Sequence, residues 1–270
     1  MKTTQIASLK RPGDLLWIWA RMDKQDLPFK DIRVRQALNM AIDRQSLVTS
    51  YYGGNADAYS SPWPNSADYA PFYTPLDQQD QAVKDLFSYN PTKAKQLLAD
   101  AGYPNGFKTS VVCTQASSDF LSIIKGNFSA IGVDMQINML DTGVYSSVSL
   151  GRTFPEMIYS IYSIMYPYKM LAVRSETTND PAFFESQQTR DAYNQINAVI
   201  GKDPTKVNQI IKGISPFMLE QATGVMLPQQ YNYTLWWPWV RNYHGEQNGD
   251  GGFSPMYVWI DQAMKSSLGH

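Results

Sequence analysis

Apolar residues recur at helical spacing between Pro28 and Val48, and this segment carries the clearest pattern in the chain. The apolar stripe consists of Val34, Leu38, Ala41 and Ile42. Asp31 stands where a helix N-cap belongs, because its carboxylate can accept N–H groups of the first turn, and Gly53 supplies a stop. The polar positions fall largely off the stripe: Arg33, Arg35, Gln36, Asp43 and Arg44. We therefore expect one helix with one buried face.

A second helix is predicted between Asn90 and Gly102. Asn90 is a favourable N-cap, and Pro91 occupies the first helical position, where no N–H is needed. The buried stripe of this helix consists of Ala94, Leu97, Leu98 and Ala101. A loop rich in Pro, Ser, Tyr and Asp, residues 53–80, precedes it and contains Trp63 between two prolines.

A β-α-β unit follows. Residues 107–115 read as a strand, residues 118–131 as a helix with one apolar face, and residues 133–140 as a strand that alternates apolar and polar positions. Such a unit implies a right-handed crossover and a parallel pair of strands. Further strands are expected at 15–22, 156–166 and 256–260, an extended stretch at 227–240, and helices at 189–200 and 203–221.

Two of these segments resemble motifs of one protein family. Residues 28–44, PFKDIRVRQALNMAIDR, resemble the signature helix of family 5 extracytoplasmic solute-binding proteins, and residues 89–103, YNPTKAKQLLADAGY, resemble a second helix of that family. These proteins are the oligopeptide, dipeptide, nickel and oligosaccharide receptors of ABC importers. The resemblance implies an α/β fold: the C-terminal lobe of a two-lobed, class II periplasmic-binding-protein-like fold, with a mixed sheet and flanking helices.

The resemblance also implies a division of the chain. Residues 1–24 are expected to be a strand and hinge remnant of a first lobe, 25–225 the second lobe, and 226–270 a segment that returns to the first lobe. In this family the signature helix lies roughly midway through a full-length receptor, and residues 1–9 carry no apolar signal core. We therefore expect that an N-terminal lobe is absent and that the chain alone binds ligand weakly. The full-length protein is expected in the periplasm or as a cell-surface lipoprotein.

Composition excludes several other functions. The net charge of −1 gives no basic excess for nucleic acid, and no run of 18 apolar residues suggests a membrane span. Cys113 is the only cysteine and lies in a predicted strand, where it acts as a small hydrophobe. The only histidines are His244 and His270, so a catalytic triad or an imidazole-rich metal site is hard to build. We expect no enzyme activity, no cofactor and no metal.

The ligand is less well defined by the sequence. Peptide-binding members of the family carry an aspartate in a segment like W-x-x-D-x-x-D-P, and this aspartate receives the ligand's α-ammonium. Alignment on Pro167 places that position near Ser163, and residues 158–167 contain no acid. Tyrosines replace it and suit hydroxyl hydrogen bonds and stacking on neutral ligands. The candidate ligand-binding residues are Tyr159, Tyr162, Tyr166, Trp63 and Gln115.

We therefore expect a solute-binding component of an ABC import system, which holds a peptide-like or other small polar ligand between two lobes and delivers it to a membrane permease. An oligosaccharide receptor of the same family is an alternative. A secreted carbohydrate-active enzyme is another, because the chain holds 17 Tyr, 11 Phe and 7 Trp beside scattered acids. A third is an adhesion module that uses the aromatic segment from Trp236 to Trp239.

Overall fold

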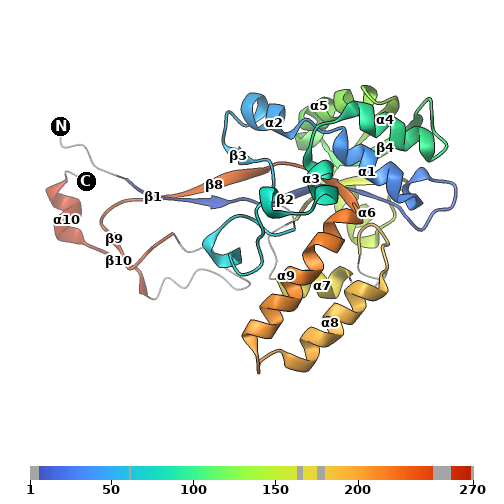
Figure 1. Ribbon diagram of the computed structural model, residues 1–270. Coiled ribbons are helices and arrows are strands. Elements are labelled where there is room, and N and C mark those ends of the chain that lie inside the picture. The colour runs from blue at the N-terminus through green and yellow to red at the C-terminus, as the bar shows by residue number, and fades with distance from the viewer. Residues whose placement is uncertain (1–5, 61, 163–166, 175–179, 246–256, 269–270) are drawn as a thin grey trace. The chain divides into compact units, whose positions relative to one another are not determined.

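The computed structural model describes residues 6–60, 62–162, 167–174, 180–245 and 257–268. The chain divides into two compact units, a larger one of residues Asp14–Gln230 and a smaller one of Met1–Gly13 with Tyr231–His270 (Figure 1). The chain therefore passes between the units twice. The three-part division at 24/25 and 225/226 stays a prediction.

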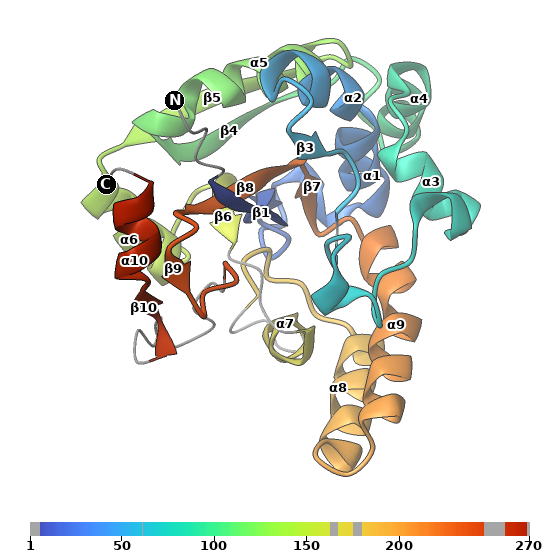
Figure 2. The ribbon, with the colours of Figure 1, turned by 90° about the vertical axis from the view of Figure 1, so that its left-hand side faces the viewer.

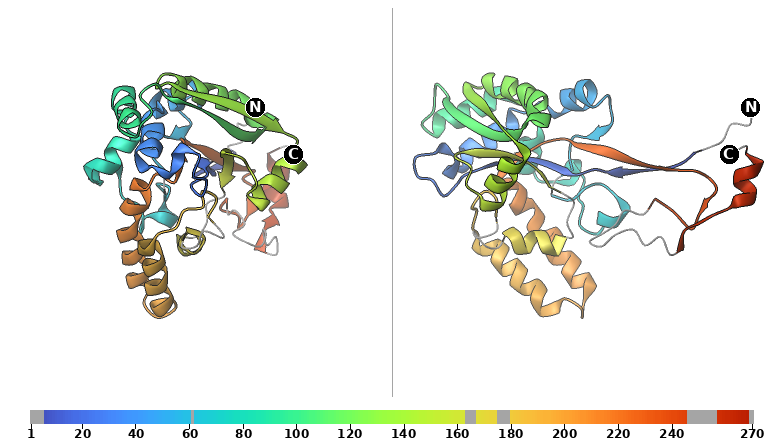
Figure 3. Two further views of the ribbon diagram at one scale, coloured as in Figure 1. Left: turned by 90° about the vertical axis from the view of Figure 1, so that its right-hand side faces the viewer. Right: turned by 180° about the vertical axis from the view of Figure 1, so that it is seen from behind.

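The larger unit is built on a five-stranded mixed sheet of order β5-β4-β6-β2-β7. Its strands are β2 (Leu15–Ala20), β4 (Phe107–Thr114), β5 (Val133–Leu140), β6 (Met157–Tyr162) and β7 (Gly224–Met226). β4 is parallel to both β5 and β6, whereas β2 is antiparallel to β6 and β7. Figure 3 shows β4 and β5 in green, side by side. The parallel β4–β5 pair, joined through a helix, confirms the predicted β-α-β unit.

Helices flank this sheet, as predicted. Their bounds are α1 Ile32–Met40, α2 Arg44–Ser46, α3 Gln81–Phe87, α4 Pro91–Asp100, α5 Ser118–Ser129, α6 Thr142–Gly151, α7 Pro167–Arg174, α8 Gln187–Val199 and α9 Pro204–Glu220. α5 packs along β5, and α1 packs against α4 and β7. α8 and α9 pack against each other as a hairpin (Figure 2). Helices α3, α6 and α7 are not anticipated from the sequence.

The centre of the core is β2, where all six residues are buried. The rings of Trp17 and Trp19 stack with centroids 4.6 Å apart. β7 pairs closely beside them at Gly224, where an added Cβ would lie 2.9 Å from the Ile18 carbonyl oxygen and 3.0 Å from a Trp17 ring atom. Glycine at this position therefore lets the two strands approach over the tryptophan pair.

The single helix predicted across Pro28–Val48 is wrong in one respect, because it breaks into α1, α2 and a π-helical turn over Leu47–Tyr51. Asp31 caps α1 as expected, since its side chain accepts the Arg33 N–H. Asp43 then caps a second start by accepting the Ser46 N–H at 2.9 Å. A side chain that bonds its own local backbone competes with helix continuation, and this explains the break.

Two arginines that the pattern assigns to the polar face are buried instead. Arg35 is 5% exposed and Arg44 is 3% exposed. The Arg35 guanidinium donates to the carbonyls of Phe29, Lys30 and Gln221. Burial costs an arginine little when its fork of N–H groups is matched by carbonyl oxygens, and periodicity cannot detect such partners.

Elements later in the chain follow the predicted pattern with shifted ends. β6 ends at Tyr162, and the rest of the strand expected to reach 166 lies outside the described residues. α9 begins at Pro204 and is capped by Asp203, the first residue of the predicted helix 203–221, whereas α8 begins at Gln187, two residues before its predicted start at 189. A short strand β3 (Ala56–Asp57) pairs with Gln229 and Gln230 at the start of β8 (Gln229–Trp236).

The smaller unit contains β1 (Ala7–Pro12), most of β8, β9 (Val240–Arg241), β10 (Trp259–Ile260) and α10 (Gln262–Ser267). β1 pairs antiparallel with β8 over its whole length, and β9 pairs with β10. Asp261 caps α10 and also accepts from the Arg241 guanidinium at 3.0 Å. These bonds tie the β9–β10 pair to α10.

Candidate functional site

The carboxyl ends of the parallel strands define the candidate site. β4, β5 and β6 run in the same direction, so their carboxyl ends at Thr114, Leu140 and Tyr162 lie at one edge of the sheet. Ligands of open α/β sheets bind outside this edge, because loops and helix N-termini there present polar groups that the strands hold rigidly. We call this edge, with Gln115, Asp141 and Ile161, the carboxyl edge.

Two polar residues follow β4 and β5 directly. Thr114 and Leu140 are paired across the parallel strands β4 and β5, which lie about 5 Å apart. Gln115 directly follows Thr114, and Asp141 directly follows Leu140. Both side chains are exposed. Asp141 occupies the N-cap of α6, but its side chain makes no capping hydrogen bond. Its carboxylate therefore remains available at the edge, beside an amide that can donate and accept.

Apolar side chains stand near these polar groups. β6 is buried from Met157 to Ser160, and Ile161 is then 59% exposed. Met139, the second-last residue of β5, and Val144, in the first turn of α6, are each 51% exposed. Exposed apolar residues that end buried strands give the carboxyl edge both hydrophobic and polar surface, the mixture typical of small-molecule sites.

Tyr159 lies one layer below this edge. It is 6% exposed, its ring lies 6.0 Å from that of Phe120, and burial raises the pKa of its hydroxyl well above the ordinary value. Its carbonyl oxygen accepts the Tyr145 hydroxyl at 2.7 Å, which ties α6 to β6. The structure thus gives Tyr159 a packing role, and its predicted contact with ligand stays a prediction.

Trp63 is also deeply buried, with 1% of its surface exposed. Its indole N–H donates to the Ser215 hydroxyl at 2.7 Å, and that hydroxyl donates to the Ile211 carbonyl. The ring therefore fastens the loop before α3 to α9 and presents almost no surface to a ligand.

Of the remaining predicted residues, Gln115 lies within the described chain, whereas the Tyr162 side chain and Tyr166 do not. Gln115 opens a 3-10 turn, Gln115–Ser117, at the carboxyl end of β4, as a site residue there should. The backbone of Tyr162 ends β6, but its side chain and all of Tyr166 lie outside the described part. Sequence reasoning missed Asp141 because α6 has a weak apolar pattern, TGVYSSVSLG, and no helix was expected after β5.

Chemistry other than binding finds little support in the described residues. Within them no three His, Cys, Asp or Glu side chains gather to hold a metal ion. Cys113 is buried in β4, where burial raises the pKa of its thiol and makes the thiolate scarce. Among the same residues, no helix has the length and apolar character needed to cross a bilayer.

The mixed sheet and flanking helices have the fold of one lobe of a class II periplasmic binding protein. The family model described as Bacterial extracellular solute-binding proteins, family 5 Middle, matches residues 3–179. The chain belongs to this family, as the two helical motifs indicate.

Named relatives agree with this assignment. The chain is 32% identical over 158 residues to the Glutathione-binding protein GsiB of Pectobacterium atrosepticum, an overlap of 57% of this chain and 28% of that protein. The chain is 26% identical over 221 residues to GsiB of Escherichia coli strain K12, an overlap of 76% of this chain and 41% of that protein. The chain thus spans less than half the length of these curated relatives.

A solved structure shares the fold. HbpA2 from Haemophilus parasuis superposes with a TM-score of 0.74 at 22% identity, over 95% of this chain and 50% of that one. The predicted α/β lobe of a two-lobed protein is therefore confirmed at the level of the fold.

Proposed function

We propose that the complete product of the gene encoding these residues is the solute-binding component of an ABC importer. It holds a peptide-like or other small polar solute at the carboxyl edge and delivers it to a membrane permease. It does so without catalysis, in the periplasm or as a cell-surface lipoprotein. The observation that carries the proposal is the family membership together with an exposed amide and carboxylate on adjacent strand ends.

Asp141 takes the place of the aspartate that the tyrosine-rich segment 158–168 lacks. An α-ammonium needs a carboxylate partner once it leaves water, because an unpaired charge in a cleft is costly. Asp141 is exposed, and its side chain makes no bond to the α6 N-terminus. A free amino group of the solute would donate to it, while the helix N-terminus behind stabilises the carboxylate.

Gln115 and the exposed apolar residues complete the proposed contacts. The Gln115 amide can donate to a carbonyl and accept from an N–H of a peptide backbone. Ile161 and Met139 supply apolar surface for a side chain of the solute. Tyr162 and Tyr166 follow in the sequence at the end of β6 and stay predicted contacts of the same ligand.

The relatives support a solute with an amino group. One relative is named a glutathione-binding protein, and the structure of DppA from Helicobacter pylori was solved in complex with the peptide STSA. An oligosaccharide is the second candidate, because the tyrosine-rich, acid-free segment suits stacking on sugar rings. Since the relatives are solute-binding proteins, the carbohydrate-active enzyme is set aside.

The experiment is a binding screen on the complete gene product by isothermal calorimetry. The solutes are glutathione, short peptides, the same peptides with an acetylated N-terminus, and oligosaccharides. The proposal expects a free-amine peptide to bind and its acetylated form to bind at least about tenfold more weakly. Equal affinity for both forms would show that Asp141 does not bind the free amine of the peptide. Binding of sugars alone would favour the oligosaccharide receptor.

A further inference from the structure

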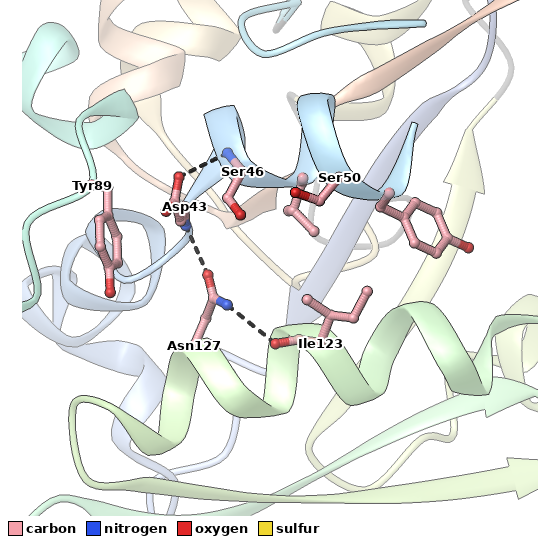
Figure 4. A pocket seen from close by; sticks show the side chains of 8 residues that line it. Asp43, Ser46, Ser50, Tyr89, Ile123 and Asn127 are labelled. Atoms are coloured by element: carbon pink, nitrogen blue, oxygen red, sulfur yellow. Dashed lines mark hydrogen bonds between the residues drawn. The ribbon is translucent and has the colours of Figure 1, made fainter. Parts of the chain in front are cut away.

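A second concave site lies away from the carboxyl edge. A pocket of about 240 Å³ opens between the α2–π-turn segment and α5, next to Tyr89 (Figure 4). Its lining residues are Asp43, Ser46, Leu47, Ser50, Tyr51, Tyr89, Ile123 and Asn127. None of them belongs to the residues of the carboxyl edge, so the pocket is not explained by the proposed solute site.

Local hydrogen bonds fix the walls of this pocket. The backbone N–H of Asp43 donates to the Asn127 side-chain oxygen at 2.7 Å, and the Asn127 amide donates to the Ile123 carbonyl at 3.2 Å. Figure 4 shows the first bond crossing from α5 to the turn before α2 and the second lying within α5. The five wall positions 43, 46, 47, 50 and 51 share one helical face, so the pocket is built before any ligand arrives.

The lining of the pocket carries a negative charge. Asp43 is the only charged residue in the lining. One of its carboxylate oxygens accepts the Ser46 N–H at 2.9 Å, and within the described residues the other accepts no hydrogen bond. Ser46 and Ser50 also line the pocket, and both residues are exposed. Together they offer a carboxylate oxygen and hydroxyl acceptors to a group with several N–H donors.

The remaining wall is apolar and accessible. Tyr51 is 46% exposed, Tyr89 48% and Ile123 40%. Aromatic faces attract cations, and such rings also cover an apolar body. The volume lies below the roughly 300 Å³ at which pockets for drug-sized ligands begin, so the occupant is small.

We propose that this pocket is a second binding site, for a small primary amine with an apolar or aromatic body. The ammonium is held by the Asp43 carboxylate and the Ser46 and Ser50 hydroxyls, and the body lies between Tyr51, Tyr89 and Ile123.

The test titrates the 270-residue chain with 2-phenylethylamine and, separately, with 2-phenylethanol, which has the same body without the charge. Amide chemical shifts of Ser46 and of the Asn127 side chain report occupancy. The proposal expects saturable shifts with the amine and at least about tenfold weaker binding of the alcohol. Equal affinity for the two compounds, or no saturable shift with the amine, would overturn it.

Variants separate the charge from the shape of the pocket. Asp43→Asn keeps an oxygen that can cap α2 and removes the charge, so it should weaken amine binding about tenfold. Asp203→Asn is the matched control, because Asp203 caps α9 with the same bond length, 2.9 Å to the Lys206 N–H, on an exposed surface. Ile123→Trp fills the pocket and should abolish binding. Unchanged affinity in Asp43→Asn, or in Ile123→Trp, would contradict the site.

Discussion

Arg44 binds both oxygens of Asn39. Its guanidinium donates to the Asn39 carbonyl at 2.9 Å and to the Asn39 side-chain oxygen at 3.1 Å. That side-chain oxygen also accepts the Met226 N–H at 3.0 Å, and Arg44 donates to the Met226 carbonyl at 2.9 Å. Arg44 and Asn39 thus hydrogen-bond both backbone groups of Met226 in β7, and within the described residues no carboxylate pairs with the buried arginine. Burial lowers the Arg44 pKa to about 9.

Arg44→Lys is expected to lower the free energy of unfolding by about 3 kcal/mol, because a single ammonium cannot reach the same carbonyls and leaves buried acceptors unpaired. Urea unfolding followed by circular dichroism measures the change. The control is Arg33→Lys on the exposed face of α1, where water screens the ion pair with Asp31 and the loss should be much smaller. Equal losses of unfolding free energy in the two variants would show that the buried hydrogen bonds of Arg44 contribute no more to stability than the exposed contacts of Arg33.

Gly106→Ala should destabilise the larger unit by several kcal/mol, an order-of-magnitude expectation for a backbone clash. Gly106 has φ +75°, and an added Cβ would lie 1.8 Å from the Gly132 carbonyl oxygen. Gly126→Ala lies in the exposed interior of α5 with no atom within 4 Å of the new Cβ, and should stabilise by about 0.5–1 kcal/mol. Thermal unfolding of both variants gives the comparison, and a stable Gly106→Ala protein would mean that the two loops separate easily.

Stability should fall above pH 10 because of the buried tyrosine at position 159. Burial raises the pKa of Tyr159, so above pH 10 the unfolded chain loses this proton while the folded chain keeps it. The stabilisation is present below the unfolded pKa and is lost as pH rises, by about 1.4 kcal/mol per pH unit from this residue. Urea unfolding between pH 9 and 11.5 should show a shallower loss in Tyr159→Phe. An identical slope in parent and variant would contradict the burial of this hydroxyl.

Particular residues show which features of the fold can be predicted from the sequence. Asn90 and Asp31 accept hydrogen bonds from residues two or three positions further along the chain, and Pro91 needs no N–H partner; all three stand at helix starts as predicted. Arg35, Arg44 and Trp63 depend on partners far away in the sequence, Gln221, Met226 and Ser215, which no periodic pattern reveals.

In the candidate site, too, some residues can be predicted from the sequence pattern and others only from the fold. Gln115 is a candidate because a predicted strand ends there; the strand ends at Thr114, and contact of Gln115 with a ligand stays a prediction. The sequence pattern does not single out Asp141, because only the pairing of Thr114 with Leu140 brings the residues after β4 and β5 to the same edge, and its proposed role depends on that register. The exposed Ile161, at the end of a buried strand, likewise needs the fold to be noticed.

The central claim, that a solute binds at the carboxyl edge, is tested most directly with the complete gene product. Small molecules that co-purify with it are identified by mass spectrometry, and calorimetry measures their affinity for the parent, Asp141→Asn, Gln115→Ala and the surface control Asp203→Asn. The account predicts a free-amine solute whose affinity falls about tenfold in the first two variants and is kept in the control. Parental affinity in both edge variants would contradict it.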